Sequence, residues 1–276
     1  MEEYYFLLGL AFVWTIFAIA QDFKKREVPN WLNFSLIGFA LAYRAFYALH
    51  VKDSGFFLFG LMGFGVFFVL AYGFYYARAF AGGDAKLLMG FGIILPYNSF
   101  SEFVYISFVF IFFLFSLGSI YSLIYSVSIV TKRKEKFFSE FKKQFVKFYL
   151  LFVIIFVFFV GISLFSNFLY GFLFLVSFSF IGLLSLYLKS LDKCLIVKTK
   201  PSKLSEGDWL EYDVRAGGRK IGKSVHGLSR ADIKWLTKFG KEVYVKEGIP
   251  FTPAFLLSLF MVFAFSVLGY QNFFLF

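Results

Sequence analysis

Two carboxylates in this sequence stand where they could serve one reaction. Asp22 lies at the end of the first apolar stretch, and Asp84 lies at the start of the fourth, after a pair of glycines. Two carboxylates that share a site cannot both ionise easily, so the pair tends to hold one proton. One acid can then take a proton from water while the other donates a proton to a carbonyl oxygen. This is cofactor-free hydrolytic chemistry.

Composition predicts that the two acids are held by membrane helices. Of the 276 residues, 60% are hydrophobic and 16% are charged, and the mean hydropathy is +0.75. Soluble domains are about half apolar and about a quarter charged, so we expect a polytopic α-helical membrane protein in a lipid bilayer. The net charge of +11 gathers in alternate loops, which indicates membrane orientation and not nucleic-acid binding.

The apolar runs predict six to eight transmembrane segments. The first covers about Tyr4–Gln21 and the second about Trp31–Leu49, with Asn30 as the N-cap. The others are expected at about Phe56–Tyr76, Asp84–Leu95, Phe103–Val130, two segments within Tyr149–Leu188 divided at Ser166-Asn167, and Pro253–Tyr270. Segments four, six and seven are the weakest crossings. The basic loops put both acids at the cytoplasmic face, with both termini outside.

Two polar regions interrupt the apolar pattern. From Lys132 to Phe148, phenylalanines recur at helical spacing among lysines, which predicts a basic amphipathic helix in the inner interface. Residues 189–248 are richer in charge and glycine, which predicts a small cytoplasmic α/β module, mainly β. The predicted domains are therefore residues 1–188, residues 189–248 and a last helix in residues 249–276. The predicted elements of the module are strands at Leu195–Lys198, Trp209–Val214 and Val243–Val245, a hairpin turn at Ala216-Gly217-Gly218, and a helix at about Arg230–Phe239 with a capping box at Ser229 and Asp232.

Each acid also has a purely structural interpretation. Asp22 could pair with Lys25 or Arg26 at the interface, and Asp84 could simply cap a helix. Metal chemistry has little support, because the sequence has one cysteine, Cys194, and two widely separated histidines. We therefore expect no metal and no cofactor.

Three sequence runs carry a family resemblance. Asp22 to Asn30 is similar to a pattern of Asp, a basic stretch and an aliphatic-Pro-Asn. Gly83-Asp84-Ala85-Lys86 is similar to the end of a GxGD motif followed by x-Lys, with Ala81 in place of the first glycine. Residues 250–253 are similar to a Pro-Phe-x-Pro run. Together they resemble the archaeal branch of the prepilin and preflagellin peptidases, which are GxGD-type membrane aspartic proteases.

The resemblance implies a function and a set of site residues. Asp22 and Asp84 would be the catalytic pair, shaped by Gly82, Gly83, Lys86, Pro250 and Pro253. The substrates would be preflagellin or type IV prepilin-like precursors, cut at the cytoplasmic face after a short basic leader. With only Cys194, the four-cysteine module of methylating bacterial relatives is missing, so we expect no N-methylation. Two alternatives stay open: an intramembrane protease like presenilin or signal peptide peptidase, and a transporter that uses both acids as ion sites.

Overall fold

The computed structural model describes residues 2–165 and 167–268. Its contacts divide the chain into two compact units, Met1–Ile124 with Gly248–Phe276, and Tyr125–Glu247. We call them the helical unit and the insert unit. Both unit boundaries differ from the predicted domain limits: one falls inside a long helix, ahead of residue 188, and the other lies at Gly248.

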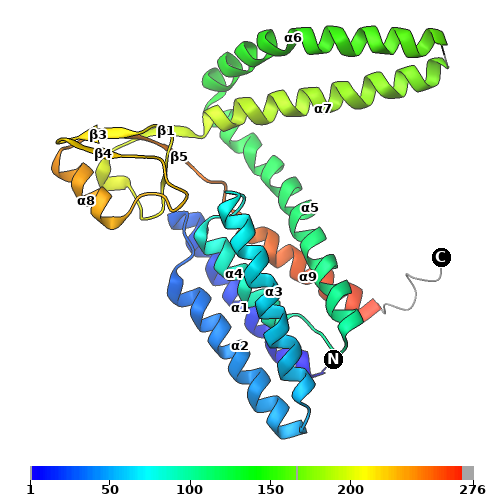
Figure 1. Ribbon diagram of the computed structural model, residues 1–276, viewed down its shortest axis with the longest axis vertical. Coiled ribbons are helices and arrows are strands. Elements are labelled where there is room, and N and C mark those ends of the chain that lie inside the picture. The colour runs from blue at the N-terminus through cyan, green and yellow to red at the C-terminus, as the bar shows by residue number, and fades with distance from the viewer. Residues whose placement is uncertain (1, 166, 269–276) are drawn as a thin grey trace. The chain divides into compact units, whose positions relative to one another are not determined.

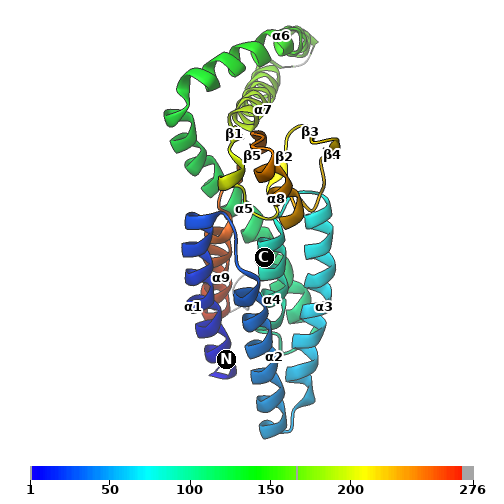
Figure 2. The same cartoon turned by 90° about the vertical axis from the view of Figure 1, so that its left-hand side faces the viewer.

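The helical unit is a bundle around one short helix. It contains α1 (Glu2–Lys25), α2 (Asn30–Val51), α3 (Ser54–Tyr76), α4 (Gly82–Ile94), the first part of α5 (Phe100–Lys132) and α9 (Thr252–Leu268). Figures 1 and 2 show α1, α2, α3, α4 and α9 running alongside one another. The predicted last helix reached Tyr270, and its final two residues lie outside the described residues.

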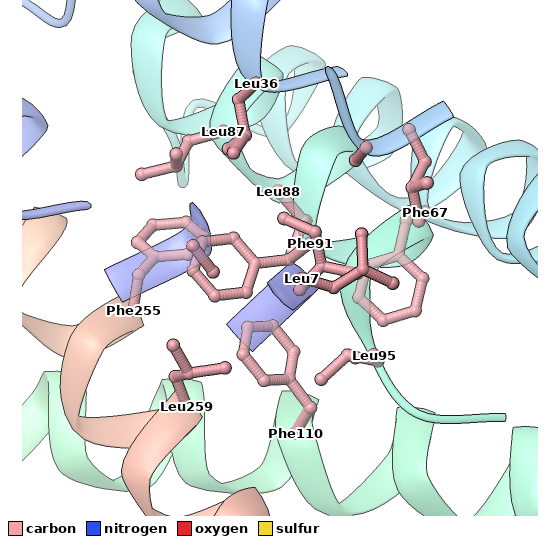
Figure 3. Packing of buried hydrophobic residues seen from close by; sticks show 14 of the residues in the cluster. Leu7, Leu36, Phe67, Leu87, Leu88, Phe91, Leu95, Phe110, Phe255 and Leu259 are labelled. Carbon is pink, nitrogen blue, oxygen red and sulfur yellow. The ribbon is translucent and has the colours of Figure 1, made fainter. Parts of the chain in front are cut away.

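Helix α4 lies at the centre of the apolar core. It has 13 residues, so it is about 20 Å long at about 1.5 Å per residue, too short to cross a bilayer core of about 30 Å. Leu87, Leu88 and Phe91 are nonetheless at most 1% exposed. Figure 3 shows them packed with core residues from the surrounding helices, among them Leu7, Leu36, Phe67, Phe110 and Phe255. A short inner helix shielded by its neighbours agrees with the sequence prediction for the fourth segment.

Glycines allow α3 to approach α4 closely. A Cβ atom built on Gly63 would lie 1.9 Å from the carbonyl oxygen of Gly92, and one built on Gly92 would lie 2.5 Å from that of Gly63. Such distances are impossible for a real side chain. Small residues of this kind let membrane helices pack backbone against backbone, where van der Waals contact supplies much of the association energy.

The far end of α4 is closed by a buried arginine. Arg44 of α2 is 0% exposed and donates three hydrogen bonds, to the carbonyl oxygens of Ile93 at 2.6 Å, Phe56 at 2.5 Å and Leu95 at 2.8 Å. Its guanidinium also lies over the ring of Phe56, 4.7 Å from the centroid. Two of these carbonyls belong to the C-terminal end of α4, where a cation is favoured by the helix dipole.

The insert unit combines a helical hairpin with a small sheet. Its helices α6 (Lys134–Phe165) and α7 (Phe168–Cys194) lie side by side in Figures 1 and 2, and the Asn167 side chain caps α7 by accepting a hydrogen bond from Leu169 N. Helix α6 corrects one prediction, because the lysine-rich stretch and the following apolar run form one continuous helix. Residue 166 of the predicted break lies outside the described residues.

The sheet module largely follows the predicted elements. Strands β1 (Ile196–Thr199), β5 (Val243–Lys246) and β2 (Trp209–Leu210) form one antiparallel sheet in that order, and β3 (Val214–Ala216) pairs with β4 (Arg219–Ile221) through a turn with positive φ at Gly217 and Gly218. Between β1 and β2 lies the 3-10 helix η1 (Pro201–Lys203). The predicted strand over Trp209–Val214 is wrong, because a bend divides it into β2 and the start of β3. Helix α8 (Arg230–Lys238) begins with the predicted capping box.

The membrane class predicted from composition is confirmed. Six described helices, α1, α2, α3, α5, α6 and α7, are long and apolar enough to cross a membrane, judged by length and composition. Helices α6 and α7 had been ranked as weak crossings from the sequence. That ranking was wrong, since α6 runs unbroken for 32 residues and α7 for 27. The chain is thus a multi-pass helical membrane protein with a small sheet module before its last helix.

Candidate active site

Asp22 is the fourth residue from the end of α1, in its last turn, and is 7% exposed. The helix continues past the predicted end at Gln21, so the carboxylate is carried by regular helix and not by a loop. The helix then stops at Arg26, whose backbone has a φ of 57° and whose N–H donates to the carbonyl oxygen of Asp22 at 2.8 Å. The Arg26 guanidinium donates to the carbonyl oxygen of Gly248, which leads into α9.

The beginning of α9 supplies the hydrogen-bond donors to Asp22. Its carboxylate oxygen Oδ2 accepts from the Thr252 hydroxyl at 2.9 Å and from the Thr252 backbone N–H at 3.3 Å. The first N–H groups of a helix have no partner within the helix, and the positive end of the helix dipole favours an anion there. Asp22 therefore caps α9 from a different helix.

Asp84 is the third residue of α4. It stands in the first turn, where the positive end of the helix dipole favours an anion. Helix α4 packs against α1, which carries Asp22, and the start of α4 packs against Val28, just after the end of α1. The two helix ends that carry these carboxylates, 62 positions apart in the sequence, therefore lie in the same region of the helical unit.

Gly83 lets the start of α4 pack against the segment that follows Asp22. A Cβ atom on Gly83 would lie 3.0 Å from Cβ and 3.1 Å from the backbone N of Val28, whereas one on Gly82 would meet only Tyr75, at 3.8 Å. Neither glycine has a positive φ. Of the two, Gly83 is therefore the one whose missing side chain is needed for close approach, and Ala81 needs no special conformation.

An amide and an aromatic ring hold the same region in place. The buried side chain of Asn33 in α2 donates to the carbonyl oxygen of Gly83 at 3.1 Å. Phe80, just before α4, is 2% exposed and its ring packs against Phe251, just before α9, with the ring centroids 5.3 Å apart. The segment before α4, the helix that carries Asp84, is thus in contact with the segment before α9, the helix that supplies the donors to Asp22.

Comparison with known proteins matches the part of the chain that contains both acids. Residues 9–123, which contain Asp22 and Asp84, match the type IV leader peptidase family. The chain resembles the type IV leader peptidases. The preflagellin peptidase of Methanocaldococcus jannaschii is 32% identical over 84 residues, and that of Methanococcus maripaludis is 28% identical over 81 residues.

These alignments are partial. They cover 30% and 29% of this chain and 36% and 35% of the two relatives, so the chain spans about a third of the length of the curated relatives that it matches. No solved structure matches the chain. The insert unit and α9 lie outside the range that matches the leader peptidase family.

Of the other predicted site residues, Lys86 has contacts of its own, away from the two acids. Lys86 does not contact Asp84; its ammonium donates to Asn30 Oδ1 at 2.6 Å and lies 5.8 Å from the centre of the Phe34 ring. Asn30 was predicted to be the N-cap of α2, which is wrong, because Pro29 occupies that position and the Asn30 side chain binds Lys86 instead. The Lys86 contact therefore ties α4 to α2.

Pro250 and Pro253 flank the segment that binds Asp22 through Thr252. Pro250 is buried, and Pro253 is the second residue of α9, where the lack of an N–H has no cost. Sequence reasoning missed Thr252 and Asn33. For Thr252 a partial signal was available, because hydroxyl residues are favoured at helix starts and Pro253 marks such a start. For Asn33 the only signal was an amide three residues after Asn30 in an apolar run.

Proposed function

We propose that this protein is a membrane aspartic endopeptidase that removes the short basic leader from preflagellin or type IV prepilin-like precursors. The observation that carries the proposal is that Asp22 and Asp84 stand on helix ends that pack together, within the range that matches the type IV leader peptidase family. The partial similarity to two archaeal preflagellin peptidases supports the same substrate class.

The chemistry follows from the two carboxylates. One carboxylate takes a proton from water as the water oxygen bonds to the scissile carbonyl carbon, and the other carboxyl group donates its proton to the carbonyl oxygen. Collapse of the resulting gem-diol breaks the C–N bond: the leaving nitrogen receives a proton from the acid that had activated the water, and the other carboxylate takes a proton back from a diol hydroxyl. The products are a leader with a new carboxyl end and a mature protein with a free amine.

The location of cleavage follows from the charge of the loops. Lys24, Lys25 and Arg26 follow Asp22 directly, and a short basic segment marks the cytoplasmic side of a membrane protein. The acids are then at the cytoplasmic interface, where the bond between a basic leader and an apolar helix would also lie. The sequence has only Cys194 and lacks a four-cysteine module, so we propose proteolysis without N-methylation.

The test is a cleavage assay on the purified full chain. Candidate precursors are incubated with the wild-type protein and with Asp22→Asn and Asp84→Asn, and the product masses are measured. Asp53→Asn is a matched control, because Asp53 caps α3 and Asn is equally suited to an N-cap. We expect cleavage by the wild type and by the control, loss of cleavage in both site variants, and a mature product without an added methyl mass.

Each alternative function gives a different result. Products cut inside the apolar helix would favour an intramembrane protease of the presenilin or signal-peptide-peptidase kind. A wild-type rate in either Asp22→Asn or Asp84→Asn would refute the catalytic pair. No cleavage of any leader-bearing precursor by the wild type, together with acid-dependent ion flux in vesicles that is lost in both variants, would favour a transporter.

A further inference from the structure

We propose that Thr252 is a positioning residue for catalysis, and that Asp22 is the acid that activates water. The proposal rests on the proposed function and assigns a role to a residue outside the range that matches the family. Thr252 is 0% exposed, and both of its hydrogen bonds to Asp22 go to the same oxygen, Oδ2. Two donors on one oxygen fix the position of Oδ2 and leave Oδ1 to face the reaction.

The surroundings of the two acids differ. Asp22 receives two donors from Thr252 at the start of α9, and hydrogen bonds to an ionised carboxylate are the stronger kind. Asp84 stands instead in the first turn of α4, a helix whose other residues, apart from Lys86, are apolar or glycine. Environments that differ in this way separate the roles of two carboxyl groups, one as base and one as acid. We therefore assign Oδ1 of Asp22 to the water and Asp84 to the carbonyl oxygen.

The hydroxyl of Thr252 does not act on its own helix. Other buried hydroxyls of the helical unit bond to a carbonyl four residues earlier: Thr15 to Ala11 at 2.6 Å in α1, and Ser258 to Ala254 at 2.7 Å in α9. A hydroxyl that bonds to the carbonyl four residues earlier in its own helix serves only the backbone of that helix. Thr252 instead reaches from one helix to the carboxylate of another, 230 residues away in the sequence.

The experiment compares Thr252→Val with Thr252→Ser in the full chain. Valine has nearly the shape of threonine and keeps the backbone N–H, so it removes only the hydroxyl bond to Oδ2. We expect kcat for precursor cleavage to fall about 10-fold with KM unchanged, because the hydroxyl orients a reacting group and does not bind substrate. Thr252→Ser keeps the hydroxyl and should restore kcat to within about twofold of the wild type.

Thr15→Val is the matched control. It removes a buried hydroxyl of the same kind from the helix that carries Asp22, but that hydroxyl bonds to its own backbone. We expect wild-type kcat from this variant, and thermal unfolding in detergent at the same temperature for Thr15→Val and Thr252→Val. A Thr252→Val enzyme with wild-type kcat, or one in which KM rises while kcat is kept, would overturn the proposal.

The outcome can be told apart from failure of the proposed function. If the wild type cleaves precursor and both Asn variants do not, but Thr252→Val cleaves normally, the peptidase function stands and the role of Thr252 is wrong. If Thr252→Val and Thr252→Ser lose kcat equally, the hydroxyl is not responsible and the positioning role is also wrong. If the wild type cleaves nothing, the proposed function itself fails.

Discussion

The two adjacent glycines before Asp84 provide a sharp test of the site geometry. Gly83→Ala would put a Cβ atom 3.0 Å from Cβ and 3.1 Å from the backbone N of Val28, whereas Gly82→Ala would meet only the edge of the Tyr75 ring at 3.8 Å. Carbon atoms pack best at about 3.5–4.0 Å. The first change therefore requires a movement of about 0.5 Å, and the second requires none.

The expected loss of activity follows from that movement. The Val28 segment follows Asp22 by six residues, and Gly83 directly precedes Asp84, so pushing them apart displaces one acid from the other. A misplacement of about 1 Å can cost about 100-fold in rate. A shift of about 0.5 Å should then cost about 10-fold, or about 1.4 kcal/mol in the barrier. Gly82→Ala should keep nearly all of the wild-type kcat.

The assay is single-turnover cleavage of a precursor, with protein folding checked by thermal unfolding in detergent. Both substitutions replace glycine by alanine in the first turn of α4, so any gain in helix propensity is shared and cancels in the comparison. Equal rates for the two variants, or a larger loss in Gly82→Ala than in Gly83→Ala, would show that the Val28 contact does not set the separation of the acids.

Three further substitutions test the fold that carries the site. Arg44→Met should destabilise the protein by about 2–5 kcal/mol, because it removes three buried hydrogen bonds, two of them to carbonyl oxygens at the C-terminal end of α4; unchanged thermal unfolding would contradict this. Gly63→Ala should lower the unfolding temperature sharply while Gly65→Ala, whose Cβ would have nothing within 4 Å, should not; equal effects would refute the close packing of α3 on α4. Ser229→Ala should cost α8 about 1 kcal/mol, seen as roughly fivefold faster amide exchange in that helix, and unchanged exchange would count against the capping box.

Much of the architecture could be predicted from the sequence because membrane helices are recognised by the length and apolar composition of their sequence. The short fourth segment, the glycine hairpin at residues 216–218 and the capping box of α8 all depend on local residues, and the structure has each of them. The continuity of α6 could not be predicted, since a change from lysine-rich to apolar sequence looks like a boundary even when the backbone continues through it.

The site was predicted only in part, for a physical reason. The two acids stand out because carboxylates are rare in apolar sequence, and the charge of the loops places them on one side. What holds them is not local in sequence: Thr252 reaches Asp22 across 230 residues, and Gly83 meets Val28 across 55. Lys86 illustrates the same limit, because its pairing with Asn30 instead of Asp84 depends on how α4 packs on α2.

The bond from Thr252 to Asp22 has a consequence for biosynthesis. Ribosomes add about 5–20 residues each second, so the 230 residues between the two partners take roughly 10–45 seconds to emerge. During that interval α1 is already made, but its carboxylate lacks the two donors that Thr252 later provides. The surroundings of Asp22 are thus complete only after α9 has joined the bundle.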